Sequence, residues 1–326
     1  SNLVLTSQHG NTIYLPSKTT ASTRRSTLYK KSDLTTSSPD TTLLASALPR
    51  GNDLYHLHST ARLLHHHIKK ESTLLQALQA QHIAHLFHHI NIDDDGEWIV
   101  RAASTKSLII VHDGSYMPHL DDCICSAAVV ILCTETMKMG TIHLCERTNQ
   151  KTASNYRGEI LGGIITSHIL QTIDSLNTCT DSAVTCYCDN LGVIHHANNH
   201  SINLPEYQTQ MDALLSFCRQ LNLVKMQWTY KHVQSHQDDT HSINELTIPQ
   251  RLNVLADAIA KQALKTAHQK QQYSRPEYPG ETIRLFVDGQ KITSSIKSAL
   301  YTSWGNQTAR IFLDKQMIVP VRHFHL

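Results

Sequence analysis

The chain has 326 residues, and 29 Lys and Arg nearly balance 27 Asp and Glu, giving a formal net charge of +2. This length accommodates about two domains, or one domain with long flanks. A hydrophobic content of 40% with only 12 Gly and 9 Pro excludes collagen-like and Pro/Gly-rich low-complexity classes. The charge balance by itself indicates neither a strongly basic nucleic-acid binder nor an acidic tail.

The N-terminal part of the chain has a different composition from the rest. Residues 1–50 are rich in Ser and Thr without helical or strand periodicity, which predicts a flexible segment. Residues 51–100 are predicted to form a helical connector, because apolar positions between 53 and 92 recur at the spacing of two short helices. The sequence Asp93-Asp94-Asp95-Gly96 predicts a turn at the end of these helices.

The central part of the chain, residues 107–265, alternates strand and helix patterns. Strands are predicted at 107–111, 126–133, 139–146, 183–188 and 224–232. Helices are predicted at 156–171, after 190, from a capping signal at 203–206 to about 221, and from a capping box at 247–250 to about 265. Short connections make the first three strands antiparallel. The order predicts an α/β fold whose five-stranded mixed sheet is flanked by helices.

The remaining segment, residues 266–326, is predicted to be a linker and a C-terminal extension. It contains a strand pattern at 282–287 and a short helix ending near Trp304. Because the chain begins with Ser1 and ends without a cap or stop signal, we expect a processed product or a truncated piece of a longer chain.

The cysteines and the apolar runs bear on the cellular compartment. The 8 Cys show no regular disulfide spacing, and no signal peptide opens the chain, so we expect reduced thiols in an intracellular protein that is not secreted. Cytoplasm and nucleus are not distinguished. The pairs Cys123/Cys125 and Cys186/Cys188 fall on strands, where they are interpreted as small apolar core residues. The longest apolar run, 127–133, is too short for a membrane span, so no membrane partner is expected.

Four acidic residues occupy positions that such a sheet brings together. Asp113 follows the first strand, Glu159 is predicted in the first turn of the first long helix, Asp189 follows the fourth strand, and Asp257 lies on the last helix. Their mutual repulsion in one cleft is tolerable only when cations neutralise it. Hard oxygen ligands of this kind suit Mg²⁺, with Mn²⁺ as the alternative ion.

At these residues the chain resembles the type I ribonuclease H family, and it is most similar to the ribonuclease H domains of retroelement polyproteins. The resemblance covers residues 107–265. Its motifs are DGS at 113–115, NYRGEILG at 155–162, Asp189 after its strand, VQSH at 233–236 and NVLADAIA at 253–260. It implies a ribonuclease H-like fold and, as a partner, a reverse transcriptase domain in the same parent polyprotein.

The same resemblance implies that the chain is a metal-dependent endonuclease, which uses two Mg²⁺ ions to hydrolyse the RNA strand of an RNA/DNA hybrid. Asp113 would hold both ions, and Asp257 would share the ion that activates the attacking water. Glu159 and Asp189 would hold the ion that stabilises the leaving oxygen. His236 would assist proton transfer or product release.

Recognition of RNA requires contacts that sense the 2′-hydroxyl group. The candidate nucleic-acid contacts are Gly114, Ser115, Asn155, Arg157 and Asn190. For Asn190 a turn or cap role at the end of the strand is the alternative.

Two departures from the family pattern keep other functions open. Asn190 and Leu191 stand where the family commonly has Ser-Gln, and the loop between His236 and Asp257 is longer than usual, with Ser235 replacing a Gly. One alternative is a catalytically inactive module of this fold that binds nucleic acid within a retroelement polyprotein. The other is a DNA-cutting nuclease or transposase relative of the same superfamily.

Charge is unevenly distributed along the chain. Residues 107–265 carry 10 Lys and Arg against 15 Asp and Glu, a net charge of −5, while residues 1–106 carry +3 and residues 266–326 carry +4. The predicted catalytic unit is therefore acidic, and the charge suited to binding a phosphate backbone lies in its flanks.

Overall fold

The computed structural model describes part of the chain in detail. The described residues are 3–6, 12–15, 28–30, 45–49, 54–59, 73–80, 84–87, 89–150, 152–177, 181–201, 204, 208–278, 284–287, 290–291, 293 and 305. The chain divides into two compact units, the larger of which comprises Leu63–Leu204 and Gln210–Glu281. This larger unit contains the predicted sheet and all the candidate site residues.

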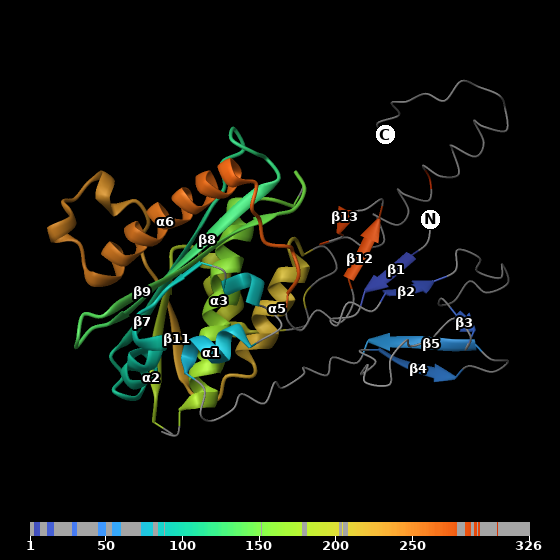
Figure 1. The fold of residues 1–326 in the computed structure, drawn as a ribbon, viewed down its shortest axis with the longest axis horizontal. Helices are drawn as coiled ribbons and strands as arrows, with labels where there is room; N and C mark the ends of the chain where they lie inside the picture. Colours follow the sequence, from blue (N-terminus) through green and yellow to red (C-terminus); the bar gives the residue numbers. More distant parts are fainter. Residues whose placement is uncertain are drawn as a thin grey trace. The chain divides into compact units, whose positions relative to one another are not determined.

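The larger unit is built on a six-stranded mixed sheet with the strand order β11-β10-β7-β8-β9-β6 (Figure 1). Strands β7, β8 and β9 form an antiparallel meander, to which β10 and β11 add in parallel on the β7 side. The strands are β6 (His89–Asn91), β7 (Leu108–Ser115), β8 (Ile124–Cys133), β9 (Met139–Arg147), β10 (Ala183–Cys188) and β11 (Gln227–His232).

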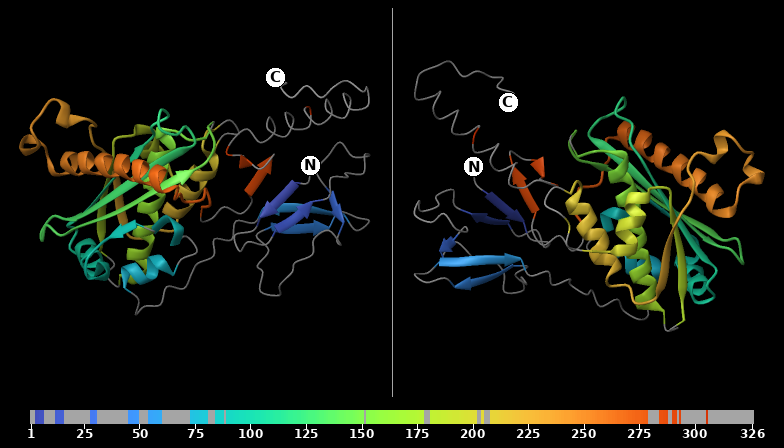
Figure 2. Two further views of the ribbon diagram at one scale, coloured as in Figure 1. Left: turned by 45° about the horizontal axis from the view of Figure 1, so that its top comes forward. Right: turned by 180° about the vertical axis from the view of Figure 1, so that it is seen from behind.

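Helices cover both faces of this sheet (Figures 1 and 2). The α-helices are α1 (Leu74–Gln79), α2 (Glu97–Ser104), α3 (Asn155–Leu176), α4 (Leu191–Asn199), α5 (Met211–Leu221) and α6 (Ile248–Lys270). Short 3-10 helices are η2 (Ala84–Phe87), η3 (Asp94–Gly96), η4 (Gln237–Asp239) and η5 (Ile243–Glu245). Side chains alternate along a strand, so Ile110 of β7 packs in the core with α3 while its neighbour Val111 packs with α6 on the opposite face.

The fold class predicted from the sequence is confirmed, because the sheet is mixed, its first three long strands are antiparallel and helices flank it. The sheet has one strand more than the five predicted. Residues 89–91, predicted to end a helical segment, instead form β6 and pair with β9. Helical spacing of the apolar residues could not reveal this pairing, which satisfies backbone groups that β9 would otherwise leave open at the edge of the sheet.

The helix boundaries follow local capping signals to different degrees. The capping box of Thr247 and Gln250 is present at the start of α6, which continues to Lys270, five residues beyond the predicted end. Helix α5 begins at Met211 after Gln210, whose backbone is left-handed. The capping signal predicted at 203–206 lies outside the described residues apart from Leu204.

Short strands also occur in the flanks. One sheet has the order β13-β12-β1-β2 and another the order β3-β5-β4. The strands are β1 (Leu3–Thr6), β2 (Thr12–Leu15), β3 (Leu28–Lys30), β4 (Ala45–Pro49), β5 (Leu54–Ser59), β12 (Arg284–Val287) and β13 (Gln290–Lys291). Four of them fall in the predicted flexible segment 1–50, where runs such as Leu-Val-Leu-Thr and Thr-Ile-Tyr-Leu favour strands despite the Ser/Thr-rich composition. The domain boundaries at 107 and 265 stay a prediction.

In the described part of the chain, no helix combines the length and the apolar character needed to cross a lipid bilayer.

Candidate metal centre

A pair of glycines brings Asp113 and Glu159 together. At Gly114, a Cβ atom would lie 2.4 Å from the backbone nitrogen of Glu159, and at Gly158 it would lie 2.5 Å from the carbonyl oxygen of Ser126. Only residues without a side chain allow strand β7 and helix α3 to approach this closely. The N-cap Ser154 starts α3 one residue earlier than predicted, so Glu159 lies in its second turn.

Asp189 reaches the same place from the neighbouring strand. It directly follows β10, which runs parallel to β7, so the two strands end at the same edge of the sheet. One carboxylate oxygen each of Asp113, Glu159 and Asp189 lies within 4.8 Å of the others. The side chains of Asp113 and Glu159 are buried, with the residues only 5% and 1% exposed. The structure therefore brings together three of the four predicted carboxylates.

The electrostatics of this cluster favour a bound cation. Burial, and then the charge of Asp189, raise the pKa of Asp113 to about 7. Burial and the charge of Asp113 raise the pKa of Glu159 well above its usual range. Among the described residues, no Lys or Arg forms an ion pair with Asp113, Glu159 or Asp189. Buried carboxylates without a cationic partner are an oxygen-only donor set, which fits Mg²⁺ or Mn²⁺.

The fourth carboxylate, Asp257, is near this cluster but not within it. Its charge raises the pKa of both Asp113 and Asp189, so the groups lie within electrostatic range. Its Oδ2 atom accepts a hydrogen bond from Lys261 Nζ at 2.7 Å, one turn further along α6. One turn before Asp257, Asn253 Nδ2 donates to Asp113 Oδ2 at 3.5 Å. Helix α6 thus supplies a carboxylate, an ammonium group and an amide to one side of the cluster.

Two histidines lie close to Asp189. Burial raises the pKa of Asp189, whereas the charges of His236 and then His232 act to lower it. His236 is an exposed residue at the start of η4 with a left-handed backbone, at φ 52°. His232 Nε2 lies 3.1 Å from the carbonyl oxygen of Asp189. The sequence analysis missed His232, although its place at the end of β11, opposite Cys188 in the parallel register, could have indicated it.

Arg157 is not available to nucleic acid, in contrast to its prediction as a contact. It is completely buried, and its guanidinium forms ion pairs with Glu146 at 2.6 Å and Asp212 at 3.1 Å. It also donates hydrogen bonds to Gln210 and to the hydroxyl of Tyr278. A buried arginine requires such partners, so its role is to tie α3 to β9, α5 and the segment after α6.

The other predicted nucleic-acid contacts divide into buried and accessible residues. Gly114 and Ser115 are buried, and Gly114 acts as the spacer between β7 and α3. Asn155 is exposed at the start of α3. Asn190 is the N-cap of α4, with Oδ1 accepting from the backbone N–H groups of Gly192 and Val193. The cap role is therefore present, and only Asn155 and the amide nitrogen of Asn190 remain as candidates for contact with substrate.

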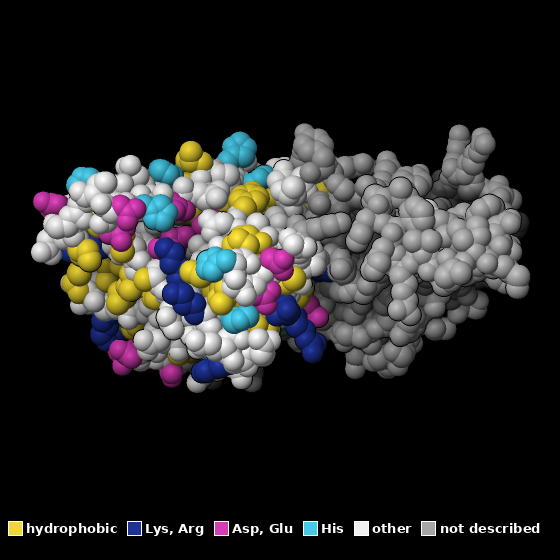
Figure 3. Space-filling view, turned by 90° about the horizontal axis from the view of Figure 1, so that it is seen from above, with side chains coloured by type: hydrophobic (Ala, Val, Ile, Leu, Met, Phe, Trp, Pro, Cys, Tyr) yellow, Lys and Arg dark blue, Asp and Glu magenta, His cyan; other side chains and the backbone are white. Residues whose placement is uncertain are grey.

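Charge on the surface near α6 is mixed. In the face shown in Figure 3, carboxylates, histidines and Lys or Arg side chains are interspersed over the described part, without a continuous basic patch. This agrees with the negative net charge of residues 107–265.

The carboxylate cluster lies at one edge of a sheet that has the ribonuclease H-like topology. No protein-family model matches the chain, and no curated protein matches it. Among solved structures, the chain is similar to the N-terminal RNase H domain of Rv2228c from Mycobacterium tuberculosis, at 14% identity and a TM-score of 0.34, over 51% of this chain and 98% of that one.

Two further solved structures show the same extent of similarity. RNase H1 from Halobacterium salinarum is 15% identical, with a TM-score of 0.32 over 49% of this chain and 98% of that one. LC11-RNase H1, solved in complex with an RNA/DNA hybrid, is 15% identical, with a TM-score of 0.35 over the same shares. The fold class of this chain rests on its own strand order and helix positions.

Proposed function

We propose that the chain is a metal-dependent endonuclease of the ribonuclease H class that hydrolyses the RNA strand of RNA/DNA hybrids. The observation that carries this proposal is the convergence of Asp113, Glu159 and Asp189 within 4.8 Å at one edge of the sheet. Asp257 supports it from α6, because its charge is felt by Asp113 and Asp189.

In this proposal Asp113, Glu159 and Asp189, with Asp257 from α6, would hold two Mg²⁺ ions. Divalent ions in such a pair activate water as a nucleophile and stabilise the charge on the leaving oxygen. Neighbouring groups orient the carboxylate of Asp113. Its Oδ1 accepts a hydrogen bond from the backbone N–H of Gly114 at 2.7 Å, and its Oδ2 accepts one from Asn253. These hydrogen bonds fix the carboxylate plane before any cation binds.

The remaining charged groups have supporting roles. Lys261 pairs with Oδ2 of Asp257 and would compete with a cation for this carboxylate. His236 is exposed and within electrostatic range of Asp189, which suits transfer of a proton to or from solvent. Asn155 and Asn190 are the contacts proposed for the nucleic acid, and the basic flanks would supply further affinity for phosphates.

The proposed partners are an RNA/DNA hybrid and, as the resemblance implies, a reverse transcriptase domain of the same parent polyprotein. One structurally similar protein, LC11-RNase H1, was solved with an RNA/DNA hybrid, which supports the choice of substrate. The second candidate function is a catalytically inactive nucleic-acid-binding module. The ion pair between Asp257 and Lys261 favours it, because this carboxylate already has a cationic partner.

A cleavage panel tests the proposal. The full chain is incubated with Mg²⁺ and labelled RNA/DNA hybrid, duplex RNA or duplex DNA. We expect cleavage of the RNA strand of the hybrid, and we expect Asp113→Asn to abolish it. The matched control Asp181→Asn should retain cleavage, because the Asp181 side chain is exposed and, among the described residues, pairs only with Lys106. Absence of hybrid cleavage by the folded parent protein would contradict the enzymatic proposal, and cleavage of DNA alone would favour the DNA-cutting relative.

A further inference from the structure

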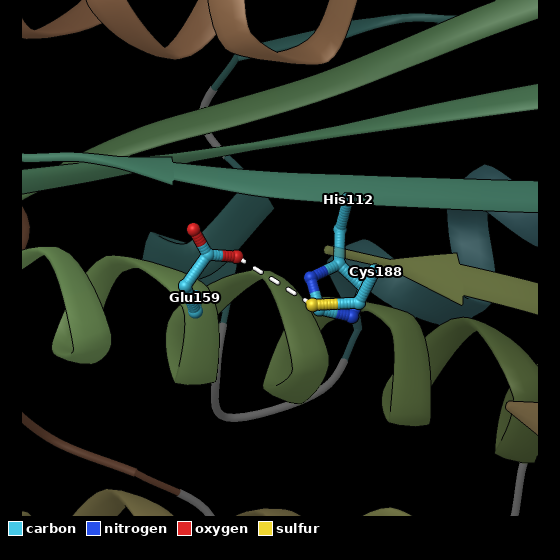
Figure 4. A group of neighbouring side chains, drawn as sticks. All are labelled: His112, Glu159 and Cys188. Atoms are coloured by element: carbon cyan, nitrogen blue, oxygen red, sulfur yellow. Dashed lines mark hydrogen bonds between the residues drawn. The ribbon is translucent and has the colours of Figure 1, made fainter. Parts of the chain in front are cut away.

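A second cluster of metal-ligating side chains adjoins the carboxylate cluster and shares Glu159 with it. One ligand atom each of His112, Glu159 and Cys188 lies within 4.8 Å of the others, and all three residues are buried (Figure 4). They come from β7, α3 and β10, respectively. In Figure 4 the imidazole and the thiol lie side by side beneath the sheet, with the carboxylate turned toward them. The sequence analysis interpreted Cys188 only as a core residue.

His112 supplies an independent sign that this cluster binds a ligand. The residue is completely buried, and neither ring nitrogen has a hydrogen-bond partner among the described residues. Its ring packs against α3, where a Cβ atom at Gly162 would lie 2.7 Å from Nδ1, and edge-on against Tyr230 at a centroid distance of 5.7 Å. A phenylalanine would fill this space without unsatisfied polar atoms. Buried nitrogens without partners are uncommon, and a bound ion is one of the partners that would satisfy them.

We propose that His112, Glu159 and Cys188 bind one borderline-soft divalent cation of the Zn²⁺ type, through a nitrogen, an oxygen and a sulfur atom. Imidazole, carboxylate and thiolate are the groups that Zn²⁺ takes as ligands, whereas Mg²⁺ prefers oxygen alone. Binding breaks the S–H bond of Cys188, forms a metal–sulfur bond and releases the proton to solvent.

The separation of two of the ligand atoms suits such an ion. Zinc bonds of about 2.0–2.3 Å put two ligand atoms of a tetrahedral ion roughly 3.3–3.8 Å apart. The thiol of Cys188 donates a hydrogen bond to Glu159 Oε2, and this Sγ–Oε2 separation of 3.6 Å lies within that range. The backbone N–H of Asn190 points at the same sulfur at 3.3 Å and would stabilise its thiolate. Three protein ligands leave one coordination position open.

Because Glu159 belongs to both clusters, the two kinds of ion compete for it. A cation held with His112 and Cys188 draws the Glu159 carboxylate away from Asp113 and Asp189. The expected consequence, inhibition of hydrolysis by Zn²⁺, rests on the proposed function. Binding of the cation does not, since it depends only on the three ligands.

Titration of the chelator-treated full chain with Co²⁺ tests the site directly. Co²⁺ replaces Zn²⁺ in such sites, and its bond to a thiolate gives a charge-transfer band in the near ultraviolet. We expect this band at one Co²⁺ per chain, bleached by added Zn²⁺, and lost in Cys188→Ser. In His112→Phe, which keeps the aromatic packing, we expect Co²⁺ affinity to fall about tenfold or more.

Two cysteine variants serve as matched controls. Cys186→Ser changes an equally buried thiol on the same strand, and Cys123→Ser removes the sulfur of a partly exposed group with Asp121 and Asp122 that could also hold an ion. Both should retain the band. The proposal is overturned when the band persists in folded Cys188→Ser, when His112→Phe binds Co²⁺ as the parent does, or when Cys123→Ser abolishes the band. Each of these results is independent of nuclease activity, so failure of the site and failure of the proposed function are distinguishable.

Discussion

The substitution Gly114→Ala tests whether the contact between β7 and α3 sets the spacing of the carboxylates. The new Cβ atom would lie 2.4 Å from the backbone nitrogen of Glu159 and 2.5 Å from the carbonyl carbon of Gly158. Both are backbone atoms, so the helix as a whole must retreat by about 1 Å to restore ordinary contact. The carboxylate of Glu159 moves with it, away from Asp113.

The magnitude follows from this displacement. Misplacing a reacting group by about 1 Å costs about 10²-fold in rate, so we expect kcat/KM on RNA/DNA hybrid to fall by about that factor. Overpacking of the interface should also lower the free energy of unfolding by about 1–3 kcal/mol. Hybrid cleavage under steady-state conditions and urea denaturation measure the two effects separately.

A second glycine variant controls for the loss of stability. In Gly163→Ala the new Cβ atom also clashes, at 2.9 Å from Cε2 of Phe217, but this contact is on the α5 side of the same helix. We expect a smaller loss of stability, because a side chain and not the backbone must shift, with activity close to that of the parent. Gly114→Ala protein that is folded and retains kcat/KM within about twofold of the parent would refute the spacer role.

Three further predictions concern charge. Because the pKa of Asp113 in the folded state is raised to about 7, its stabilising contribution is complete below its unfolded pKa of about 4 and is lost as pH rises toward 7. The metal-free protein should thus be less stable to urea at pH 7 than at pH 5, and Asp113→Asn should flatten this dependence. Lys261→Met removes the competitor for Asp257, so calorimetric titration should show about twofold to fivefold tighter Mg²⁺ binding; unchanged affinity would contradict the competition. Arg157→Met breaks two buried ion pairs and should lower the free energy of unfolding by about 3–5 kcal/mol in urea denaturation. The surface variant Lys106→Met should lower it by less than about 1 kcal/mol.

Much of the sheet could be predicted because its signals are local. Residues 108–111 of β7 and most of β8 are apolar runs typical of buried strands. The capping box of Thr247 and Gln250 indicates the start of α6 from residues three apart. The convergence of Asp113, Glu159 and Asp189 could also be predicted from the order of the elements. Asp113 and Asp189 lie at the ends of neighbouring parallel strands, and such strands end at the same edge of the sheet.

The role of Arg157 could not be predicted from its neighbours in sequence. Its partners Glu146, Asp212 and Tyr278 come from β9, α5 and the segment after α6, and only the assembled fold buries them together. A charged residue beside a candidate catalytic residue favours the prediction of an exposed contact, because arginine is seldom fully buried. The long-range ion pairs reverse that expectation.

The close approach at Gly114 links the properties of the candidate site to one another. It forces the carboxyl groups of Asp113 and Glu159 into a buried space, and burial together with their mutual charge raises the pKa of Glu159. Glu159 also lies within reach of Cys188, whose Sγ is 3.6 Å from Oε2. A single carboxylate therefore belongs both to an all-oxygen cluster and to a cluster with a nitrogen and a sulfur atom. Which of the two it serves depends on the cation available, so the identity of the metal, as well as its presence, should control this site.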